Sequence, residues 1–428
     1  MVTAVAIAII VLAFYFLVRG LDVRLILFSA GVALGALALK PWLVFDSFER
    51  AMGDGKTIGP ICSAMGYAFL LRATGCDREM VRVLIAPICR VRWLLIPGGC
   101  LIGFITNIAI TSQTAAAAAV GSILIPLMLA ARFHPVIAAG TLVLGCSGGG
   151  SLLNPGDADL VALQKFSGAP MKMAIESMFL PLLGGFGAAV VSFSLLSRRI
   201  PPMPEESVMN LVAESGSINY FKAWLPPLPV LLLFASMPQV GLIPPLLKLY
   251  PNGLPVPHAM LICAVLVLIV GGKEVSRLTR EFFEGMGFAY VQVISLIITA
   301  SCFIAGLRLV GLTEKLVHMV SSPGVAGLAA SGFFPWLLAV ICGSGIAPSV
   351  AFSETVLPTL SQTDLSGALN LGTFAALCAN FGRTMSPVAA VVIFTTTLVK
   401  VTPLEIVKRT AAPLIIGMIV AGVVIATR

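Results

Sequence analysis

The chain has 428 residues, of which 58% are hydrophobic and only 11% are charged, and its mean hydropathy is +1.03. A soluble domain carries about 25% charged residues, so this composition excludes a single soluble domain and indicates a surface that mostly faces lipid. The net charge of +8 comes from short basic clusters between apolar stretches, and no basic stripe with interleaved aromatic residues points to nucleic acid.

Three apolar stretches open the chain, at residues 2–18, 25–40 and 57–73. Each approaches the roughly 20 residues that a helix needs to cross a bilayer. The first charge, Arg19, follows the first stretch, which therefore lacks the basic leading region of a signal peptide. We expect residues 2–18 to be a retained first span.

Residues 93–131 form two apolar arms around a polar turn, Thr111-Ser112-Gln113-Thr114. Arginines precede and follow this segment, which predicts a re-entrant hairpin that opens to the cytoplasm. A turn at membrane depth leaves backbone groups without partners unless protein, an ion or water satisfies them. We therefore expect these four residues to bind substrate. The alternative is an ordinary helix pair that packs through the five alanines after the turn.

The next stretch, 136–166, is too long for one crossing unless it is broken. Its centre, residues 146–157, holds a run of glycines and Pro155, which favour unwinding and remove a helix hydrogen bond. The N-terminus of a half-helix offers free N–H groups and positive dipole to a carboxylate, so we expect Asn154 to bind substrate. Asp157 lies at membrane depth, where a charge marks a pathway, whereas we expect Asp159 to be solvated. The alternative is a simple kink.

Residues 198–223 are the longest polar stretch and divide the chain into halves as a cytoplasmic linker. The second half begins with apolar stretches at 224–246, 257–271 and 285–307, each expected to cross the membrane. The apolar stretch 171–197 closes the first half in the same way.

Residues 331–360 predict a second hairpin, with less basic flanks, that opens to the outer face. Its turn is Gly343-Ser344-Gly345, from which Ser344 and Gly345 are candidate substrate ligands. Glu354 lies in its second arm, and we expect this acid, or Asp157, to carry a coupling proton or cation.

The stretch 368–400 is again too long and contains the polar segment 378–387, which predicts a second interrupted helix. Arg383 stands out within it, because a guanidinium can hold a carboxylate by two hydrogen bonds. Thr384 and Ser386 are further candidate substrate ligands. The alternative for Arg383 is a structural ion pair with Asp157 or Glu354.

Matching residues recur in the two halves at one constant separation in residue number. This separation, from Pro126 to Pro358, is called the repeat offset below. It also pairs Pro155 with Pro387, Pro181 with Pro413, Ser112 with Ser344, Thr141 with Thr373, Cys146 with Cys378 and Gly150 with Gly382.

The basic clusters give this repeat an orientation. When they are placed on the cytoplasmic side, the chain makes about ten crossings, with both termini outside. An odd number of crossings then lies between equivalent points of the two copies, so the repeats are inverted. Inverted repeats are typical of secondary transporters, which bind substrate where broken helices meet.

The C-terminal residues resemble a known family. Asn380-Phe-Gly-Arg-Thr-Met-Ser-Pro-Val, followed by Lys400-Val-Thr-Pro-Leu-Glu-Ile-Val-Lys-Arg, is similar to the C-terminal signature of the DcuC family of anaerobic C4-dicarboxylate carriers. The segment from Gly343 to Glu354 resembles the second hairpin of that family. The likeness extends over nearly the whole chain and is looser in the first half.

This resemblance implies an all-α, polytopic, elevator-type transporter, with two re-entrant hairpins, that works as a homodimer in the bacterial inner membrane with periplasmic termini. Residues 1–92 and 224–307 would form the scaffold, and 93–197 and 308–428 the two halves of the transport domain. The implied substrates are succinate, fumarate or malate, moved by exchange or by cation-coupled symport. The Thr-Ser-Gln-Thr turn differs from the Ser-Asn-Thr turns of sodium-coupled relatives, so the coupling ion, proton or sodium, stays open.

Other functions fit less well. An intramembrane serine hydrolase would need a histidine on a span, and a channel would need a continuous polar stripe. The nine cysteines form no CxxC or Cys/His spacing, so we expect no metal site and no cofactor. The main alternative is a carrier of the same fold for another organic or inorganic anion.

Overall fold

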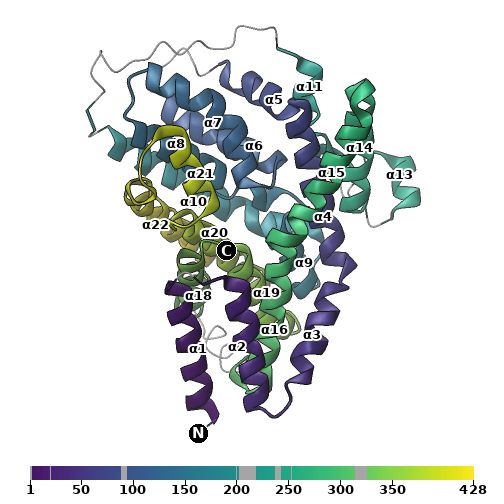
Figure 1. The fold of residues 1–428 in the computed structure, drawn as a ribbon, viewed down its shortest axis with the longest axis vertical. Coiled ribbons are helices and arrows are strands. Elements are labelled where there is room, and N and C mark those ends of the chain that lie inside the picture. Colours follow the sequence, from purple (N-terminus) through teal and green to yellow (C-terminus); the bar gives the residue numbers. More distant parts are fainter. Residues whose placement is uncertain are drawn as a thin grey trace.

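The computed structural model describes residues 2–19, 21–87, 94–198, 200–201, 218–236, 242–251, 253–313 and 325–428. Every regular element in these ranges is a helix (Figure 1). A wide upper part contains α5, α6, α7, α8, α10, α21 and α22, and a narrower lower part contains α1, α2, α3 and much of α16. Most of the predicted linker, residues 202–217, lies outside the described residues, as do the flanking Arg90 and Arg92 of the first hairpin.

The first half folds into a series of helices within the described ranges. They are α1 (Val2–Val18), α2 (Val23–Leu37), α3 (Trp42–Met52), α4 (Gly55–Thr74), α5 (Cys76–Ile85), α6 (Leu95–Ala109), α7 (Gln113–Ala130), α8 (Pro135–Ser147), the 3₁₀ turn η2 (Gly150–Leu153), α9 (Ala158–Ser167) and α10 (Met171–Ser197). The helices α3 and α5 were not predicted, since both mix charged and apolar residues.

The described part of the second half contains α11 (Tyr220–Trp224), α12 (Leu228–Ala235), α13 (Pro244–Leu249), α14 (Val256–Gly271), η4 (Gly272–Glu274), α15 (Val275–Ala289), a π-helical turn η5 (Tyr290–Ile294), α16 (Ser295–Leu309), α18 (Val325–Cys342), α19 (Ile346–Leu360), α20 (Leu365–Thr384), α21 (Ala390–Val399) and α22 (Pro403–Ala426). The prediction of one span over 224–246 is wrong. Its described residues form separate short helices, because several prolines interrupt hydrogen bonding there.

The bounds of the helices recur at the repeat offset. Residues 158–167 form α9, and the equivalent residues 390–399 form α21. The long helices α10 and α22 begin at equivalent positions, Met171 and Pro403. The C-caps of α9 and α21, Gly168 and Lys400, are likewise equivalent, and both adopt left-handed backbone conformations. Each half therefore contains the same order of helix pair, interrupted helix and long helix.

The two long helices α10 and α22 cross at a pair of glycines. A Cβ on Gly185 would lie 2.8 Å from the carbonyl oxygen of Gly417, and one on Gly417 would lie 2.5 Å from that of Gly185. These two glycines are also separated by the repeat offset. Close approach through small residues is how apolar helices pack when both are surrounded by lipid.

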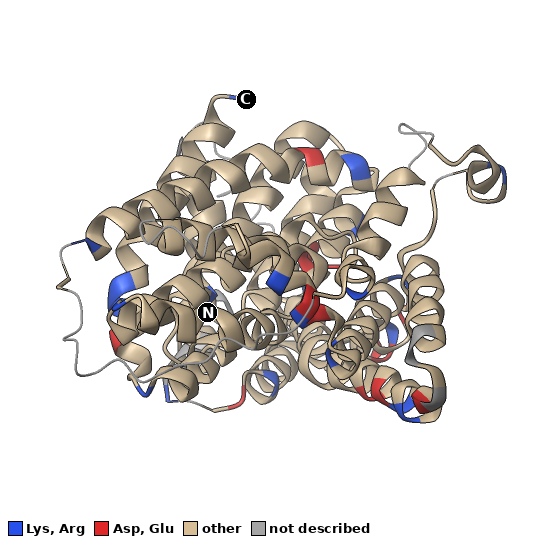
Figure 2. Ribbon diagram, turned by 90° about the horizontal axis from the view of Figure 1, so that it is seen from above, with Lys and Arg blue, Asp and Glu red and all other residues tan. Residues whose placement is uncertain are grey.

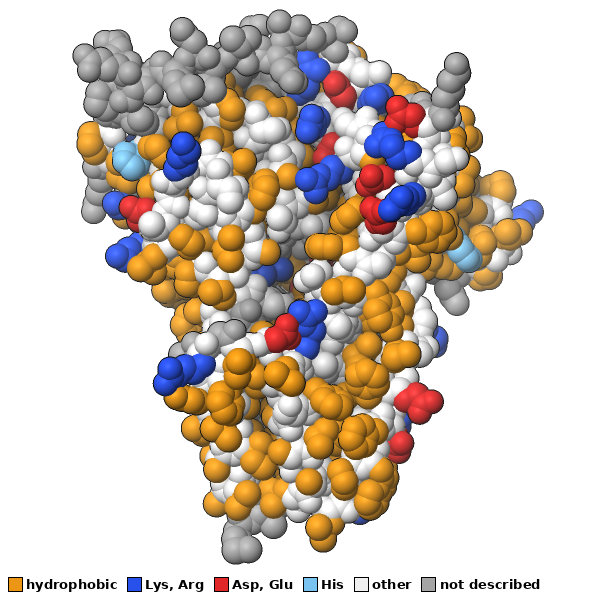
Figure 3. All heavy atoms as spheres, in the orientation of Figure 1, with side chains coloured by type: hydrophobic (Ala, Val, Ile, Leu, Met, Phe, Trp, Pro, Cys, Tyr) orange, Lys and Arg blue, Asp and Glu red, His pale blue; other side chains and the backbone are white. Residues whose placement is uncertain are grey.

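Five helical segments are long and apolar enough to cross a membrane by length and composition, within the described part of the chain. They are 113–130, 135–167, 171–197, 275–309 and 403–426. Hydrophobic side chains cover most of the lower part of the face in Figure 3, whereas charged side chains gather towards the top and at the narrowing. The helix lengths and the apolar surface are therefore those of a multi-pass membrane protein.

Candidate functional site

The first interrupted helix breaks at a glycine that no other residue replaces without strain. Gly149 has φ of +97°, in the left-handed region that disfavours a side chain. One 3₁₀ turn and an extended Asn154 follow, and α9 then starts with Asp157 as its N-cap, whose Oδ1 accepts a hydrogen bond from the Asp159 N–H at 3.0 Å. The predicted break is confirmed.

The second break is shorter than predicted. The helix α20 continues through Thr384, and only residues 385–389 separate it from α21. Asn380 and Arg383 are therefore helical, and the expectation that residues 378–384 unwind is wrong. A glycine is needed at 382 because the carbonyl oxygen of Trp336 lies 2.5 Å from where a Cβ would be, a close contact between α18 and α20.

The two breaks meet through hydroxyl groups. The side chains of Ser147 and Thr384 lie 2.6 Å apart, and the Thr384 hydroxyl also lies 2.8 Å from the Ser147 carbonyl oxygen. Ser147 donates to Gln113 Oε1 of the first hairpin at 3.1 Å. Ser147 and Thr384 are 0% exposed. Three of the four predicted polar segments thus contact one another, although the sequence analysis did not single out Ser147.

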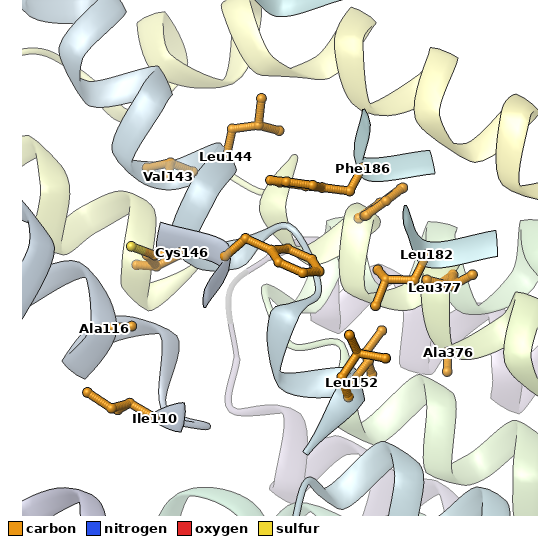
Figure 4. Packing of buried hydrophobic residues seen from close by; sticks show 14 of the residues in the cluster. Ile110, Ala116, Val143, Leu144, Cys146, Leu152, Leu182, Phe186, Ala376 and Leu377 are labelled. Carbon is orange, nitrogen blue, oxygen red and sulfur yellow. The ribbon is translucent and has the colours of Figure 1, made fainter. Parts of the chain in front are cut away.

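Two asparagines attach the first hairpin to the first break. Asn107 accepts from the Ser151 N–H at 3.0 Å and donates to the Ile110 carbonyl at 3.0 Å. Asn154 donates to the Ile108 carbonyl at 2.7 Å. The Asn154 side chain is therefore engaged in holding the hairpin. Figure 4 shows the apolar cluster around this junction, with Cys146 and Leu152 on either side of the break and Phe186 and Leu377 packed near them.

The turn of the second hairpin packs on the second interrupted helix. Gly343 has φ of +68°, and a Cβ on it would lie 3.0 to 3.2 Å from Val388 and Ala389. A Cβ on Gly345 would lie 3.1 Å from the Ala379 carbonyl oxygen, next to Asn380. The backbone of the second turn thus approaches both α20 and the residues of the second break.

Asn380 is a polar residue that the sequence analysis did not name as a ligand. It is 1% exposed, and within the described residues neither its Oδ1 nor its Nδ2 has a hydrogen-bond partner. A buried amide without partners costs about 1–3 kcal/mol, so such groups in native structures call for an explanation. Its position between Gly149 and Gly345 places it where the first break and the second turn converge.

An arginine and two acids lie together beside these breaks. Arg383 interacts electrostatically with both Asp157 and Asp159, and Ser349 of α19 lies next to Asp159. Asp159 is only 2% exposed, so the expectation that it is solvated is wrong. The structure packs α9 against both α19 and α20, which encloses Asp159 and the preceding N-cap Asp157. Figure 2 shows acidic and basic segments together near the centre of the view.

Glu354 has different surroundings. Its Oε2 accepts a hydrogen bond from Ser301 of α16 at 2.8 Å, and Arg308 of α16 donates to its main-chain carbonyl at 3.2 Å. Both partners fall in or next to the predicted scaffold. The structure therefore places Glu354 at the contact between α16 and α19.

The remaining predicted ligands are near the turns. Ser112 caps α7 by accepting from the Ala115 N–H at 3.3 Å, and Ser386 is fully buried and accepts from the Val388 N–H at 3.4 Å. Thr111, Thr114 and Ser344 are half-buried. Within the described residues no group of three or more His, Cys, Asp or Glu side chains has metal-binding geometry.

The sequence model of one family, described as "DcuC: C4-dicarboxylate anaerobic carrier", matches residues 58–428. A Vibrio cholerae protein named "Probable anaerobic C4-dicarboxylate transporter DcuC" is 26% identical over 95% of this chain and 93% of its own. A Haemophilus influenzae "Putative uncharacterized transporter" is 29% identical over 63% of this chain and 98% of its own.

Two solved structures share the fold. The Alcanivorax borkumensis YdaH transporter superposes with a TM-score of 0.61 at 15% identity and covers 97% of both chains. Neisseria gonorrhoeae MtrF, described as one of a class of antimetabolite efflux pumps, gives a TM-score of 0.58 at 14% identity, over 90% of this chain and 83% of its own. Both are transporters, and at these identities the likeness concerns the fold alone.

Proposed function

Because the chain belongs to the DcuC family of C4-dicarboxylate carriers, we propose that it moves succinate, fumarate or malate across the bacterial inner membrane. Its family and its relatives are transporters, so it is not an enzyme. The observation that carries the proposal within the structure is the meeting of both helix breaks at Ser147 and Thr384, beside Arg383.

The chemistry of this site suits an anion with two carboxylates. Arg383 offers a planar fork for one carboxylate, and hydroxyl and amide groups of Thr384, Ser147 and Asn380 offer hydrogen bonds to the other. Ser344, Gly345 and Ser386 would complete the site from the second turn and break, and Thr111, Ser112, Gln113 and Thr114 from the first turn. The complete burial of Ser147 and Thr384 means that a substrate reaches them only when a hairpin moves.

The transport cycle that we propose is an elevator. Residues 93–197 and 308–428 would move as a unit against a scaffold of 1–92 and 224–307, in a homodimer with periplasmic termini. The recurrence of helix bounds at the repeat offset supports two related halves. The basic flanks of the first hairpin and the less basic flanks of the second support their inversion.

Coupling would use a buried acid. Asp157 lies beside Arg383, while Glu354 lies at the contact of α16 and α19, so the two acids are in different environments. Asp159, which is buried like Asp157, joins them as a candidate. By this criterion the acid that is farther from Arg383 is the better proton carrier, since a cation favours the ionised form.

Uptake by the purified protein in proteoliposomes tests this function. Labelled succinate, fumarate and malate should accumulate or exchange, and lactate and sulfate should neither be taken up nor compete. The same vesicles with imposed sodium or pH gradients separate symport from exchange. Uptake of lactate or sulfate in preference to all three dicarboxylates would instead support the same-fold carrier for another anion.

A further inference from the structure

A cavity of about 580 Å³ lies apart from the helix breaks. On one side it is lined by α3, α4 and α16, which belong mainly to the proposed scaffold, and on the other by α9 and α19, which belong to the proposed transport domain. Its charged lining residues are Arg50, Asp54, Lys165, Arg308 and Glu354. Figure 3 shows side chains of both charges meeting at the narrowing of the molecule.

The two acids of this cavity have different partners, a lysine for Asp54 and a neutral hydroxyl for Glu354. Asp54 pairs with Lys165 and accepts a hydrogen bond from the Thr57 hydroxyl at 2.5 Å. Burial raises the pKa of Asp54, but the hydrogen bonds from Lys165 and Thr57 outweigh it and bring the pKa below its ordinary value. The Glu354 carboxylate accepts from Ser301. The Lys165 charge is therefore largely balanced by Asp54.

The two arginines are held differently, although Arg308 also lies within electrostatic reach of the Glu354 carboxylate. Arg50 Nε donates to the main-chain oxygen of Asp46 at 3.2 Å, and Arg308 Nη2 donates to that of Glu354 at 3.2 Å. Within the described residues neither forms a salt bridge with a carboxylate. A guanidinium held by a neutral carbonyl keeps its charge and further N–H donors for an anion.

Both exposed and buried side chains line the cavity, so it leads from the surface into the protein and is called the funnel below. Arg50, Lys165 and Arg308 are exposed, whereas Ala162 and Val350 in its lining are buried. Ala162 lies about one helical turn beyond Asp159 on α9, and Val350 adjoins Ser349, which lies next to Asp159. The floor of the funnel is thus a single turn of α9 away from the cluster of Arg383 and two acids.

We propose that this cavity is an entry site for a dicarboxylate dianion, which Arg50 and Arg308 bind by its carboxylates before it reaches the helix breaks. The inference rests on the proposed function and adds a second location for the same substrate. Three basic and two acidic side chains line the cavity, so its charge favours an anion, and the two guanidinium groups can each take one carboxylate of a dianion. In the proposed topology the funnel opens to the outer face.

Kinetics of Arg50→Gln and Arg308→Gln test the entry site. Labelled succinate uptake is measured in vesicles of phosphatidylcholine alone, which contain no anionic headgroup that could occupy the cavity. We expect each variant to lower kcat/KM at least about threefold through KM, with kcat little changed, and to weaken the dependence of uptake on potassium chloride concentration. Lys172→Gln is the matched control, because Lys172 lies on α10 outside the cavity and its loss removes the same charge.

The outcomes separate the two proposals. Wild-type protein that transports no dicarboxylate would overturn the proposed function and the entry site together. Wild-type transport with unchanged KM and salt dependence in both arginine variants would overturn the entry site alone. Arg308 also supports α19, so Arg308→Gln changes packing as well as charge. Arg50 is an exposed residue of α3, so Arg50→Gln tests the entry site without disturbing the fold. Equal effects in Lys172→Gln would show a general surface charge effect and would also overturn the entry site.

Discussion

At the scale of single residues, the asparagines and hydroxyls at the helix breaks differ in whether they have hydrogen-bond partners. Asn107 and Asn154 use their amides to attach the first hairpin, and Ser147 and Thr384 bond to each other. Asn380 alone among these has both amide atoms buried without partners in the described part of the chain. This contrast is why we propose that Asn380 contacts the substrate, whereas the other residues hold the site together.

Asn380→Leu should lower dicarboxylate uptake at least tenfold and leave the melting temperature in detergent unchanged or higher. Leucine removes a buried unpaired amide, which costs about 1–3 kcal/mol, and keeps a side chain of comparable size. Asn107→Leu is the contrasting variant and should lower the melting temperature, because both of its hydrogen bonds are lost. Full uptake by Asn380→Leu would show that its amide does not contact substrate.

Arg383→Lys should also lose transport, because lysine keeps the charge but not the planar fork. A hydrogen bond to a charged group contributes about 1.5–3 kcal/mol, so affinity for succinate should fall by roughly tenfold or more. Equilibrium binding of labelled succinate measures it. Arg280→Lys is the control, since Arg280 has an 82% exposed side chain on α15.

A structural role for Arg383 predicts a different result. If its task is to neutralise Asp157, the double variant Arg383→Gln with Asp157→Asn should recover both stability and succinate binding. Recovery of binding would refute a direct contact between Arg383 and substrate.

One buried acid should set the pH dependence of transport. Asp157→Asn, Asp159→Asn and Glu354→Gln are compared for succinate exchange and for uptake driven by a pH gradient. We expect one variant to keep exchange but lose its response to the gradient, because an amide cannot carry a proton. Wild-type pH profiles in all three would leave sodium coupling or simple exchange as the better account.

At the scale of elements, glycines decide how closely the helices approach. Gly185 and Gly417 allow α10 and α22 to cross at backbone contact, and Gly149 and Gly343 supply the left-handed turns at the first break and the second hairpin. Both halves have the same helix order, with bounds that recur at the repeat offset, because they share this pattern of small residues and prolines.

Gly417→Ala should destabilise the protein by about 1–3 kcal/mol through overpacking. The added Cβ would lie 2.5 Å from the Gly185 carbonyl oxygen, which is backbone and cannot move aside alone. Thermal melting in detergent measures the effect. Gly187→Ala is the matched control on α10, since a Cβ there meets nothing within 4 Å, and alanine favours a helix. Equal stability of both variants would contradict the crossing contact.

At the scale of the whole molecule, the proposed elevator divides the chain into two parts. The helix breaks and hairpin turns lie together in one part, and the cavity with Arg50 and Arg308 lies where that part meets α3, α4 and α16. Only a few polar contacts among the described residues cross this boundary, such as Lys165 with Asp54 and Ser301 with Glu354. The small number of polar bonds at this boundary is consistent with the proposed motion.

Cysteine labelling should place Arg132 and Asp364 on opposite faces of the membrane. The prediction follows from the basic flanks of the first hairpin and the less basic flanks of the second. Single cysteines at these two positions in a cysteine-free variant are reacted with an impermeant maleimide in right-side-out vesicles. Asp364 should react from outside and Arg132 only after permeabilisation. Reaction of both from the same side would contradict the inverted repeat.

The sequence by itself determined the membrane class, the family, the repeated spacing and the first break, because these depend on composition, local glycine and proline chemistry, and spacing along the chain. It also indicated the second break, but not that α20 continues through Thr384. Tertiary structure decided which polar groups are satisfied. Ser147 with Thr384, the unpaired Asn380 and the enclosed Asp159 depend on packing between residues that are distant in sequence. The cavity at Arg308 likewise arises only when α3, α4, α9, α16 and α19 come together, since burial and hydrogen bonding are properties of neighbours in space.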